Sequence, residues 1–331
     1  MIIVATRPSQ RLHDATVAPV ATRATKGAWF KHWRLVSIDG STLDVADEPA
    51  LAEAFGRPDG GRGESAYPQI RFVSLVENGT HVLFGTRMDK YGVSEIALAR
   101  QVLASLVAGM LLLGDRNFFN FQMWSDARAT GADLLWRVKT NARLPQEKIL
   151  PDGSYLSHIY PSEKDRRHKT NGVQVRIVEY RLEGIADADP IYRLVTTIFD
   201  SELASAEELA SLYHERWEIE PSFRDSKDLR FGMGMSALRI DNPQRRDRLL
   251  LLNAFAILLL TLLGAAGESL GMDKQLRTST VKRRVHSLFR QGCLLYELIP
   301  NMPEASLRPL VERYQETLRQ NASFSETFGF V

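Results

Sequence analysis

The sequence has little cysteine, no excess of charge of either sign and no apolar segment of signal-peptide length at its start. Its one cysteine, Cys293, cannot form an internal disulfide or a cysteine-rich zinc site, so a reducing compartment is expected. Lys and Arg number 42 against 40 Asp and Glu, so contact with nucleic acid would have to come from a local basic patch. The apolar residues 1–5 are followed by Arg7, which is too early for a secretion signal. With 331 residues, 44% of them hydrophobic, the chain is expected to be globular.

Long apolar runs are also scarce, and the exception is Leu249–Gly267, which contains no charged residue. Its length would suffice for a membrane span. Asn253, Thr261 and Gly264 interrupt the run, and the rest of the sequence has the amphipathic patterning of a soluble protein. We therefore expect a core helix buried against the sheet, because a helix that is apolar all round can lie in the centre of a large domain. A membrane-anchored protein is the alternative.

The order of predicted elements is that of an α/β protein with a mixed sheet. Residues 1–32 show no clear hydrophobic period and are predicted to be an irregular lead-in. Asn78-Gly79 lies between two alternating segments, which strongly favours a β-hairpin. Up to residue 139 the predicted strands are 35–45, 70–76, 81–86, 110–113 and 133–139, and the predicted helices are 93–111, which merges with the strand after it, and 118–129.

Residues 140–204 favour short β segments separated by Gly and Pro, notably 173–180 and 192–198, and are predicted to form a β-rich insertion. A helix begins after them at Ser205. The predicted divisions are a lead-in at 1–32, the first part of a core at 33–139, the insertion at 140–204, a helical second part of the core at 205–300 and a C-terminal tail at 301–331.

Three carboxylates far apart in the sequence are the candidates for chemistry. Asp39 follows the first strand, Asp115 follows the fourth, and Glu220 lies on the helix after the insertion. If strands one and four are neighbours, the first two meet at one edge of the sheet, and a helix over that edge can supply the third. Carboxylate oxygens suit Mg²⁺, and two such ions about 3.5–4 Å apart can activate a nucleophile and stabilise the leaving oxygen of a phosphodiester. A lone Asp is ordinarily a turn or cap residue, so the prediction depends on the combination of all three carboxylates. The competing first-strand candidates, Asp44 and Asp47, should point away from this site.

The most specific stretch begins at Tyr213. Tyr213, Arg216, Glu220 and Lys227 are spaced by three, four and seven residues, which places all four within about a 60° arc of a helix. One helix face would then present a phenol, a guanidinium, a carboxylate and an ammonium. Spacing alone does not separate a functional face from a solvated salt-bridge face.

These residues resemble the DDE transposases of the insertion sequence 4 family, whose signature is Tyr, two residues, Arg, three residues, Glu, six residues and Lys. The four residues named above match this signature. The resemblance extends to Ile38-Asp39-Gly40-Ser41 for the first catalytic Asp and to Leu113-Gly114-Asp115-Arg116-Asn117-Phe118 for the second, with Asn117 where the family commonly has Gly. It runs from about residue 33 to about residue 296.

The resemblance implies a ribonuclease H-like fold, with a mixed sheet flanked by helices and interrupted by the β-rich insertion. It implies that Asp39, Asp115 and Glu220 are catalytic and bind Mg²⁺, for which Mn²⁺ would substitute. The Tyr, Arg and Lys of the signature, Tyr213, Arg216 and Lys227, would bind phosphates of the transposon end.

The function implied is that of a DNA transposase, in which water cuts a phosphodiester at the element's end and the released 3′-hydroxyl attacks a second one. The implied partners are double-stranded DNA, as transposon ends and as target, and a second copy of the chain when DNA is bound. No membrane partner is expected. The implied location is the bacterial cytosol, with the protein at the nucleoid when DNA is bound. Family members usually carry a helical end-recognition domain before the first catalytic Asp, so this chain is expected to be N-terminally shortened. The alternative is a catalytically silent truncated transposase that inhibits by binding DNA or a full-length transposase.

Two basic clusters outside the signature are further candidates for phosphate contacts, and a solvated helix face is the alternative for each. They are Arg245, Arg246 and Arg248, and Lys282, Arg283 and Arg284 with His286 and Arg290.

Overall fold

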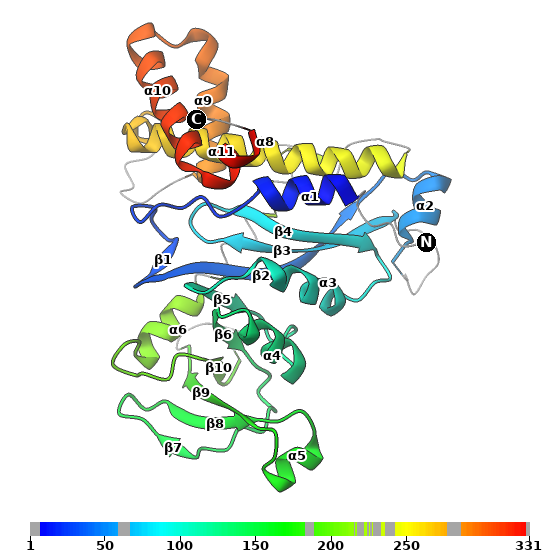
Figure 1. The fold of residues 1–331 in the computed structure, drawn as a ribbon, viewed down its shortest axis with the longest axis vertical. Coiled ribbons are helices and arrows are strands. Elements are labelled where there is room, and N and C mark those ends of the chain that lie inside the picture. The colour runs from blue at the N-terminus through cyan, green and yellow to red at the C-terminus, as the bar shows by residue number, and fades with distance from the viewer. Residues whose placement is uncertain are drawn as a thin grey trace.

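Figure 1 shows the computed structural model, which describes residues 7–58, 67–182, 189–214, 216, 222–223, 225, 227, 233–235, 242–276 and 286–328. Through these residues runs one mixed sheet in the order β4-β3-β2-β5-β6-β10-β9-β8-β7, with β1 paired to β2. The strands are β1 (Trp29–Phe30), β2 (Trp33–Asp44), β3 (Gln69–Glu77), β4 (Val82–Lys90), β5 (Met110–Gly114), β6 (Asp133–Arg137), β7 (Lys148–Ile149), β8 (Tyr155–Ile159), β9 (Val173–Tyr180) and β10 (Tyr192–Thr196). The helices are α1 (Arg7–Thr16), α2 (Pro49–Phe55), α3 (Glu95–Val102), α4 (Phe121–Ala129), α5 (Glu163–His168), α6 (Ala206–His214), α8 (Pro243–Ser269), α9 (Leu288–Leu298), α10 (Glu304–Gln320) and α11 (Ala322–Phe328), with short 3₁₀ turns η1 (Leu103–Ser105), η4 (Met272–Lys274) and η5 (Ile299–Asn301).

The centre of the sheet is buried on both sides. β5 is parallel to β2 and to β6, and its run of leucines is fully buried. Leu112 packs in the core that includes α3 and α4, whereas Leu111 and Leu113 pack in the core that includes α6. Parallel strands covered on both faces are continuously apolar, which is the pattern seen here. The predicted mixed α/β sheet with flanking helices is confirmed.

The predicted hairpin connects β3 to β4 through Asn78-Gly79. Gly79 has φ +78°, a backbone conformation that favours glycine, and a Cβ there would come 2.4 Å from the carbonyl oxygen of Lys26. Both the turn and the neighbouring segment therefore require glycine at this position.

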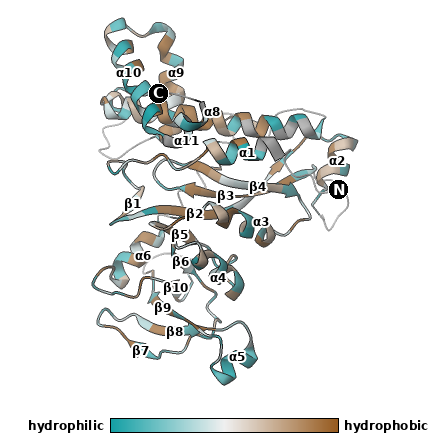
Figure 2. Cartoon of the chain, in the orientation of Figure 1, coloured by the Kyte–Doolittle hydropathy of each residue, from teal (hydrophilic) through white to brown (hydrophobic). Residues whose placement is uncertain are grey.

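The β-rich insertion continues the central sheet. β10 pairs antiparallel with β6, with Val195 opposite Trp136, and β9, β8 and β7 follow outward. In Figure 1 these strands lie below β6, and α5 marks the far end; Figure 2 shows α5 mostly in the teal of hydrophilic residues. The insertion therefore shares a hydrogen-bonded sheet with the core.

Helix α8 contains the long apolar run. Leu258 and Leu262 are buried in the same core as the sheet, whereas Leu252 is 60% exposed. Among the described residues, α8 is the helix that is long and apolar enough to cross a membrane by length and composition, and 47% of its apolar window is buried inside the protein. The predicted helix is present and is buried all round its circumference at residues 261–264, whereas Leu252 near its start is exposed.

Two segments are more regular than the sequence predicts. The lead-in contains α1, whose Asp14 pairs with Arg87 of β4 at 2.9 Å and whose Gln10 side chain donates to the Thr86 carbonyl oxygen at 3.2 Å. Because polar contacts hold this helix, its sequence shows no apolar stripe. The predicted tail contains α10 and α11, which pack beside α8 and α1; Leu310 of α10 is fully buried.

Candidate active site

The ends of two adjacent strands bring the first two predicted carboxylates together. In the parallel pair of β2 and β5, Ile38 lies opposite Gly114, so Asp39 and Asp115 occupy the next position on each strand path. Both side chains are partly exposed. The prediction that strands one and four are neighbours is confirmed.

A cation and a phenol lie against this edge. Arg216 Nη1 is 3.5 Å from Asp39 Oδ2. Burial on its own would lower the pKa of Arg216, but the nearby groups of Tyr213, Asp115 and Asp39 outweigh it and raise that pKa. The Tyr213 hydroxyl donates to the Gly114 carbonyl oxygen at 3.3 Å, and burial raises the pKa of Tyr213. The tyrosine is 3% exposed, so it supports the end of β5 in this structure, and a contact with phosphate stays a prediction.

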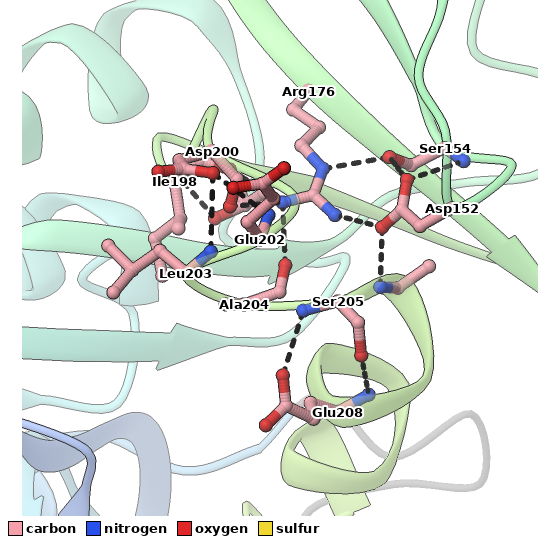
Figure 3. Close-up of polar contacts among 12 residues, drawn as sticks. Asp152, Ser154, Arg176, Ile198, Asp200, Glu202, Leu203, Ala204, Ser205 and Glu208 are labelled. Carbon is pink, nitrogen blue, oxygen red and sulfur yellow. Dashed lines mark hydrogen bonds and ion pairs between the residues drawn. The ribbon is translucent and has the colours of Figure 1, made fainter.

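A buried polar network fixes the start of α6, the helix that carries Tyr213 (Figure 3). Arg176 of β9 is fully buried; it donates to Ser154 Oγ at 2.8 Å and to the Ala204 carbonyl oxygen at 2.8 Å, and it pairs with Asp152. Asp152 Oδ2 in turn accepts the backbone N–H of Ala206 at 2.7 Å. The insertion therefore holds the N-terminus of the helix that leads into the site.

The first turn of α6 also has a capping box. Ser205 Oγ accepts the backbone N–H of Glu208 at 3.2 Å, and the Glu208 carboxylate accepts the backbone N–H of Ser205 at 2.8 Å. The helix begins where the sequence predicts, and these reciprocal bonds satisfy two of its unpaired amides.

Lys227, the last residue of the signature, contacts β2 at Ser41, two residues beyond Asp39. Its Nζ donates to Ser41 Oγ and lies 5.6 Å from the ring of Phe72. Phe223 packs edge-on against Phe72 at 5.2 Å between ring centroids, which holds this segment on β3. Burial lowers the pKa of Lys227, and the charge of Asp44 partly offsets that.

A further acidic residue, which the sequence reasoning missed, reaches the same edge. Glu95 is the first residue of α3, and a Cβ at Gly40 would come 1.9 Å from Glu95 Oε1. Burial and the negative charges of Asp39 and Asp115 raise the pKa of Glu95, while Arg71 opposes the shift. In the sequence this glutamate is indistinguishable from an acidic residue that favours the N-terminus of its own helix.

Comparison with known proteins decides the family. Residues 30–259 match the family described as Transposase DDE domain. The chain belongs to the DDE transposases. It is 26% identical over 229 residues to the protein named "Transposase InsG for insertion sequence element IS4" of Escherichia coli strain K12, and the matched region covers 68% of this chain and 49% of that protein. It is 28% identical over 130 residues to "Putative transposase InsZ" of the same strain, which covers 39% of this chain and 43% of that protein. These similarities place it with the transposases of the insertion sequence 4 family, and the chain spans about half the length of the curated relatives it matches.

Glu220, which the sequence predicts as the third carboxylate, lies outside the described residues, as do Lys282, Arg283 and Arg284. The side chain of Arg246 is not described either. Their predicted roles stay predictions. The described members of the two basic clusters are exposed or partly exposed: Arg245, Arg248, His286 and Arg290.

DDE transposase domains generally use divalent metal ions, and the described part of the edge fits such an ion in its donor chemistry. Asp39 and Asp115 offer carboxylate oxygens, which hard divalent cations prefer, on neighbouring strands and with access to solvent. Within the described ranges, no three His, Cys, Asp or Glu side chains gather closely enough to hold an ion by themselves. A complete set of direct protein ligands would therefore need a donor beyond those described, and Glu220 is the predicted one.

Proposed function

We propose that this transposase cuts DNA at transposon ends and joins the cut strand to a second DNA, with Asp39, Asp115 and Glu220 as its catalytic, metal-binding carboxylates. The observation that carries the proposal is the register of β2 against β5, which sets Asp39 beside Asp115 although 76 residues separate them in sequence. Two acidic side chains at adjacent strand ends repel each other unless a cation lies near them. Arg216 already contributes one positive charge at this place.

The proposed chemistry has two balanced steps. First, a water oxygen attacks phosphorus at the transposon end, the bond from phosphorus to the 3′-oxygen breaks, and that oxygen takes up a proton and leaves as a hydroxyl. Second, this 3′-hydroxyl loses its proton, attacks a phosphorus of the target DNA and displaces another 3′-oxygen, so one phosphodiester replaces another. A divalent cation, Mg²⁺ or Mn²⁺, would supply positive charge to the attacking and leaving oxygens.

The basic residues of the signature would hold the DNA. Arg216 and Lys227 both lie near Asp39, one against its carboxylate and the other on Ser41 two residues along β2. Each could exchange that partner for a phosphate oxygen, because charged hydrogen bonds to phosphate are strong. We propose double-stranded DNA as the partner and a homodimer as the DNA-bound form.

The test is cleavage of a labelled duplex that carries the ends of the parent element, with Mg²⁺ present. Cleavage should stop when the ion is chelated and should fall by orders of magnitude in Asp115→Asn. Asp126→Asn is the matched control, since Asp126 is a carboxylate on α4 that pairs with Arg100 outside the edge. Equal loss of activity in both variants would count against a specific role for Asp115.

DNA binding by the same proteins distinguishes the enzyme from the catalytically silent alternative. If Asp115→Asn binds the duplex as the parent chain does and only the parent cuts it, the carboxylate serves chemistry. If the parent chain binds DNA with Mg²⁺ present but never cuts it, the proposal of catalysis is wrong and an inhibitory DNA-binding role takes its place.

A further inference from the structure

Glu95 approaches the catalytic edge from the side opposite to α6. α3 packs on β2, β3 and β4, and the Glu95 carboxylate lies over the α-carbon of Gly40, one residue beyond Asp39. Gly40 does not adopt a positive φ, so glycine is needed here to leave space for the Glu95 side chain rather than for backbone conformation. β5 ends at Gly114, opposite Ile38. Beyond that pair β5 does not continue the sheet next to β2, so the two faces of the sheet are open to each other beside Asp39 and Gly40.

Little in the described surroundings of the Glu95 carboxylate compensates for its charge. Among the residues that the structure describes, no hydrogen bond or ion pair to the Glu95 side chain is formed, and the adjacent Ser94 makes no side-chain cap for α3. The guanidinium of Arg71 is the nearby positive charge, and it is held by the Val93 carbonyl oxygen at 3.2 Å and by the ring of Tyr91. A half-buried carboxylate beside two others is unfavourable by itself, and a bound cation would reverse that.

We propose that Glu95 is a positioning residue of the catalytic edge, which strengthens the binding of a divalent cation at Asp39 and Asp115 through its negative charge. This inference rests on the proposed function. Glu95 acts at longer range than a direct ligand, because no three acidic side chains of the described residues gather closely enough to hold an ion. Substitution of groups just outside the direct ligands of a metal typically changes its affinity by about 10-fold or more, although these groups do not touch the metal.

The experiment measures Mn²⁺ binding to the full chain without DNA, from the paramagnetic resonance signal of the free ion. Glu95→Gln keeps the size of the side chain and removes its charge, and it should raise the Kd for Mn²⁺ about 10-fold. Glu304→Gln is the matched control, since Glu304 is exposed on α10 and the substitution changes the net charge equally. The control should bind Mn²⁺ as the parent chain does.

A second variant moves the carboxylate without removing it. The atom that a Cβ at Gly40 would meet first is the end of the flexible Glu95 side chain, so Gly40→Ala should fold and displace the carboxylate. It should weaken Mn²⁺ binding in the same direction as Glu95→Gln, and the double variant should be no weaker than Glu95→Gln alone. Independent, additive losses would show that Gly40 does not act through Glu95.

Thermal unfolding without divalent ions separates this role from a structural one. If Glu95 merely stabilises the start of α3, Glu95→Gln lowers Tm and leaves the Kd for Mn²⁺ unchanged, which overturns the inference. If instead Asp115→Asn binds Mn²⁺ as tightly as the parent chain, the proposed metal edge itself is wrong and the role of Glu95 falls with it. A loss of affinity in Asp115→Asn with none in Glu95→Gln leaves the proposed function intact and rejects only the inference.

Discussion

Arg216 is a cation that the fold itself places beside Asp39. Its Nη1 atom is 3.5 Å from the carboxylate, and the arginine side chain is only 14% exposed. A metal ion and this guanidinium compete for the same negative charge, so Arg216→Gln should bind Mn²⁺ a few-fold more tightly while it binds DNA more weakly. Paramagnetic resonance and a DNA filter-binding assay measure the two effects. Arg100→Gln, which removes a half-exposed arginine that pairs with Asp126, should change neither, and weaker Mn²⁺ binding in Arg216→Gln would contradict the competition.

Lys227 and Glu220 should separate DNA binding from chemistry. Lys227→Ala removes one phosphate contact, so DNA binding should weaken and the slope of log affinity against log salt should become shallower by about one unit. Glu220→Gln removes a charge that a divalent ion needs, so cleavage should fall by orders of magnitude while DNA binding persists or tightens. Titrations of DNA binding at several salt concentrations and a cleavage assay test the pair. Undiminished cleavage by Glu220→Gln would exclude this carboxylate as a metal ligand.

At the scale of single residues, the sequence predicts that Asp39 and Asp115 lie together, but it does not predict all of their surroundings. The spacing of Asp39, Asp115 and Arg216 pointed to one site because strand order and a family signature both constrain them. Glu95 escaped notice because its relation to Gly40 depends on how α3 packs over β2, which no local pattern records. The phosphate contact expected of Tyr213 stays a prediction, and its surroundings were not foreseen: its ring is buried and its hydroxyl donates to the Gly114 carbonyl oxygen.

Among the elements, α6 depends on the insertion for the position of its first turn. Replacing the fully buried Arg176 with Met would remove its bonds to three backbone carbonyls and to Asp152, and should destabilise the protein by about 3 kcal/mol. Urea unfolding measures this loss. Arg166→Met is a suitable control, because Arg166 pairs with Glu163 on the surface of α5. Equal stability of the two variants would show that the network does not anchor α6.

The same network gives a dependence on pH. Burial by itself would raise the pKa of Asp152, but hydrogen bonds from Ser154 and from the Ala206 amide, with the charge of Arg176, outweigh it and lower that pKa. A lowered carboxylate pKa stabilises the fold above the ordinary Asp value of about 3.9, and the contribution is lost as pH falls through the lowered value. The free energy of unfolding should therefore drop below about pH 4, and less so in Asp152→Asn. Unfolding in urea across this range measures it, and identical pH profiles would contradict the assignment.

Two glycines set the contact between α8 and α9. A Cβ at Gly264 would come 1.9 Å from the Leu288 carbonyl oxygen, and one at Gly292 would come 1.8 Å from the Leu260 carbonyl oxygen. Because these are backbone atoms, the helices must move apart, and either Gly→Ala change should cost about 1–3 kcal/mol or more. Gly92→Ala, at a position with no atom within 4 Å of the new Cβ, should be neutral in the same denaturation experiment. Neutral changes at all three positions would show that this contact is not close-packed.

Several elements with an apolar period were predicted, whereas α1, which polar contacts hold, was not. β5 and β6 are short apolar runs, and the hairpin has the Asn78-Gly79 turn, so sequence alone places all of them. α1 was missed because it faces its neighbours with polar side chains. Gln10 and Asp14 bond to residues of β4, and His13 is buried. Long-range polar pairing leaves no period in the sequence.

For the whole molecule, the insertion looked separate in sequence and is continuous in structure. The change to short β segments after residue 139 marks a change of composition, and it gave no indication that β10 would pair with β6. Pairing over such a distance depends on which strand edge is open, and β6 offers its free edge beside β5. The core and the insertion are therefore predicted to be one mechanical unit.

A single cooperative unfolding transition is the consequence of this continuity. The tryptophans at 29, 33, 124, 136 and 217 all lie outside the insertion, whereas far-ultraviolet circular dichroism reports on every strand. If the hydrogen bonds between β10 and β6 and the bond from the Ala206 N–H to Asp152 couple the two regions, tryptophan fluorescence and circular dichroism should give coincident urea transitions. An insertion that unfolds independently would lose part of the dichroism signal while the tryptophans other than Trp136, which lies opposite Val195, stayed native.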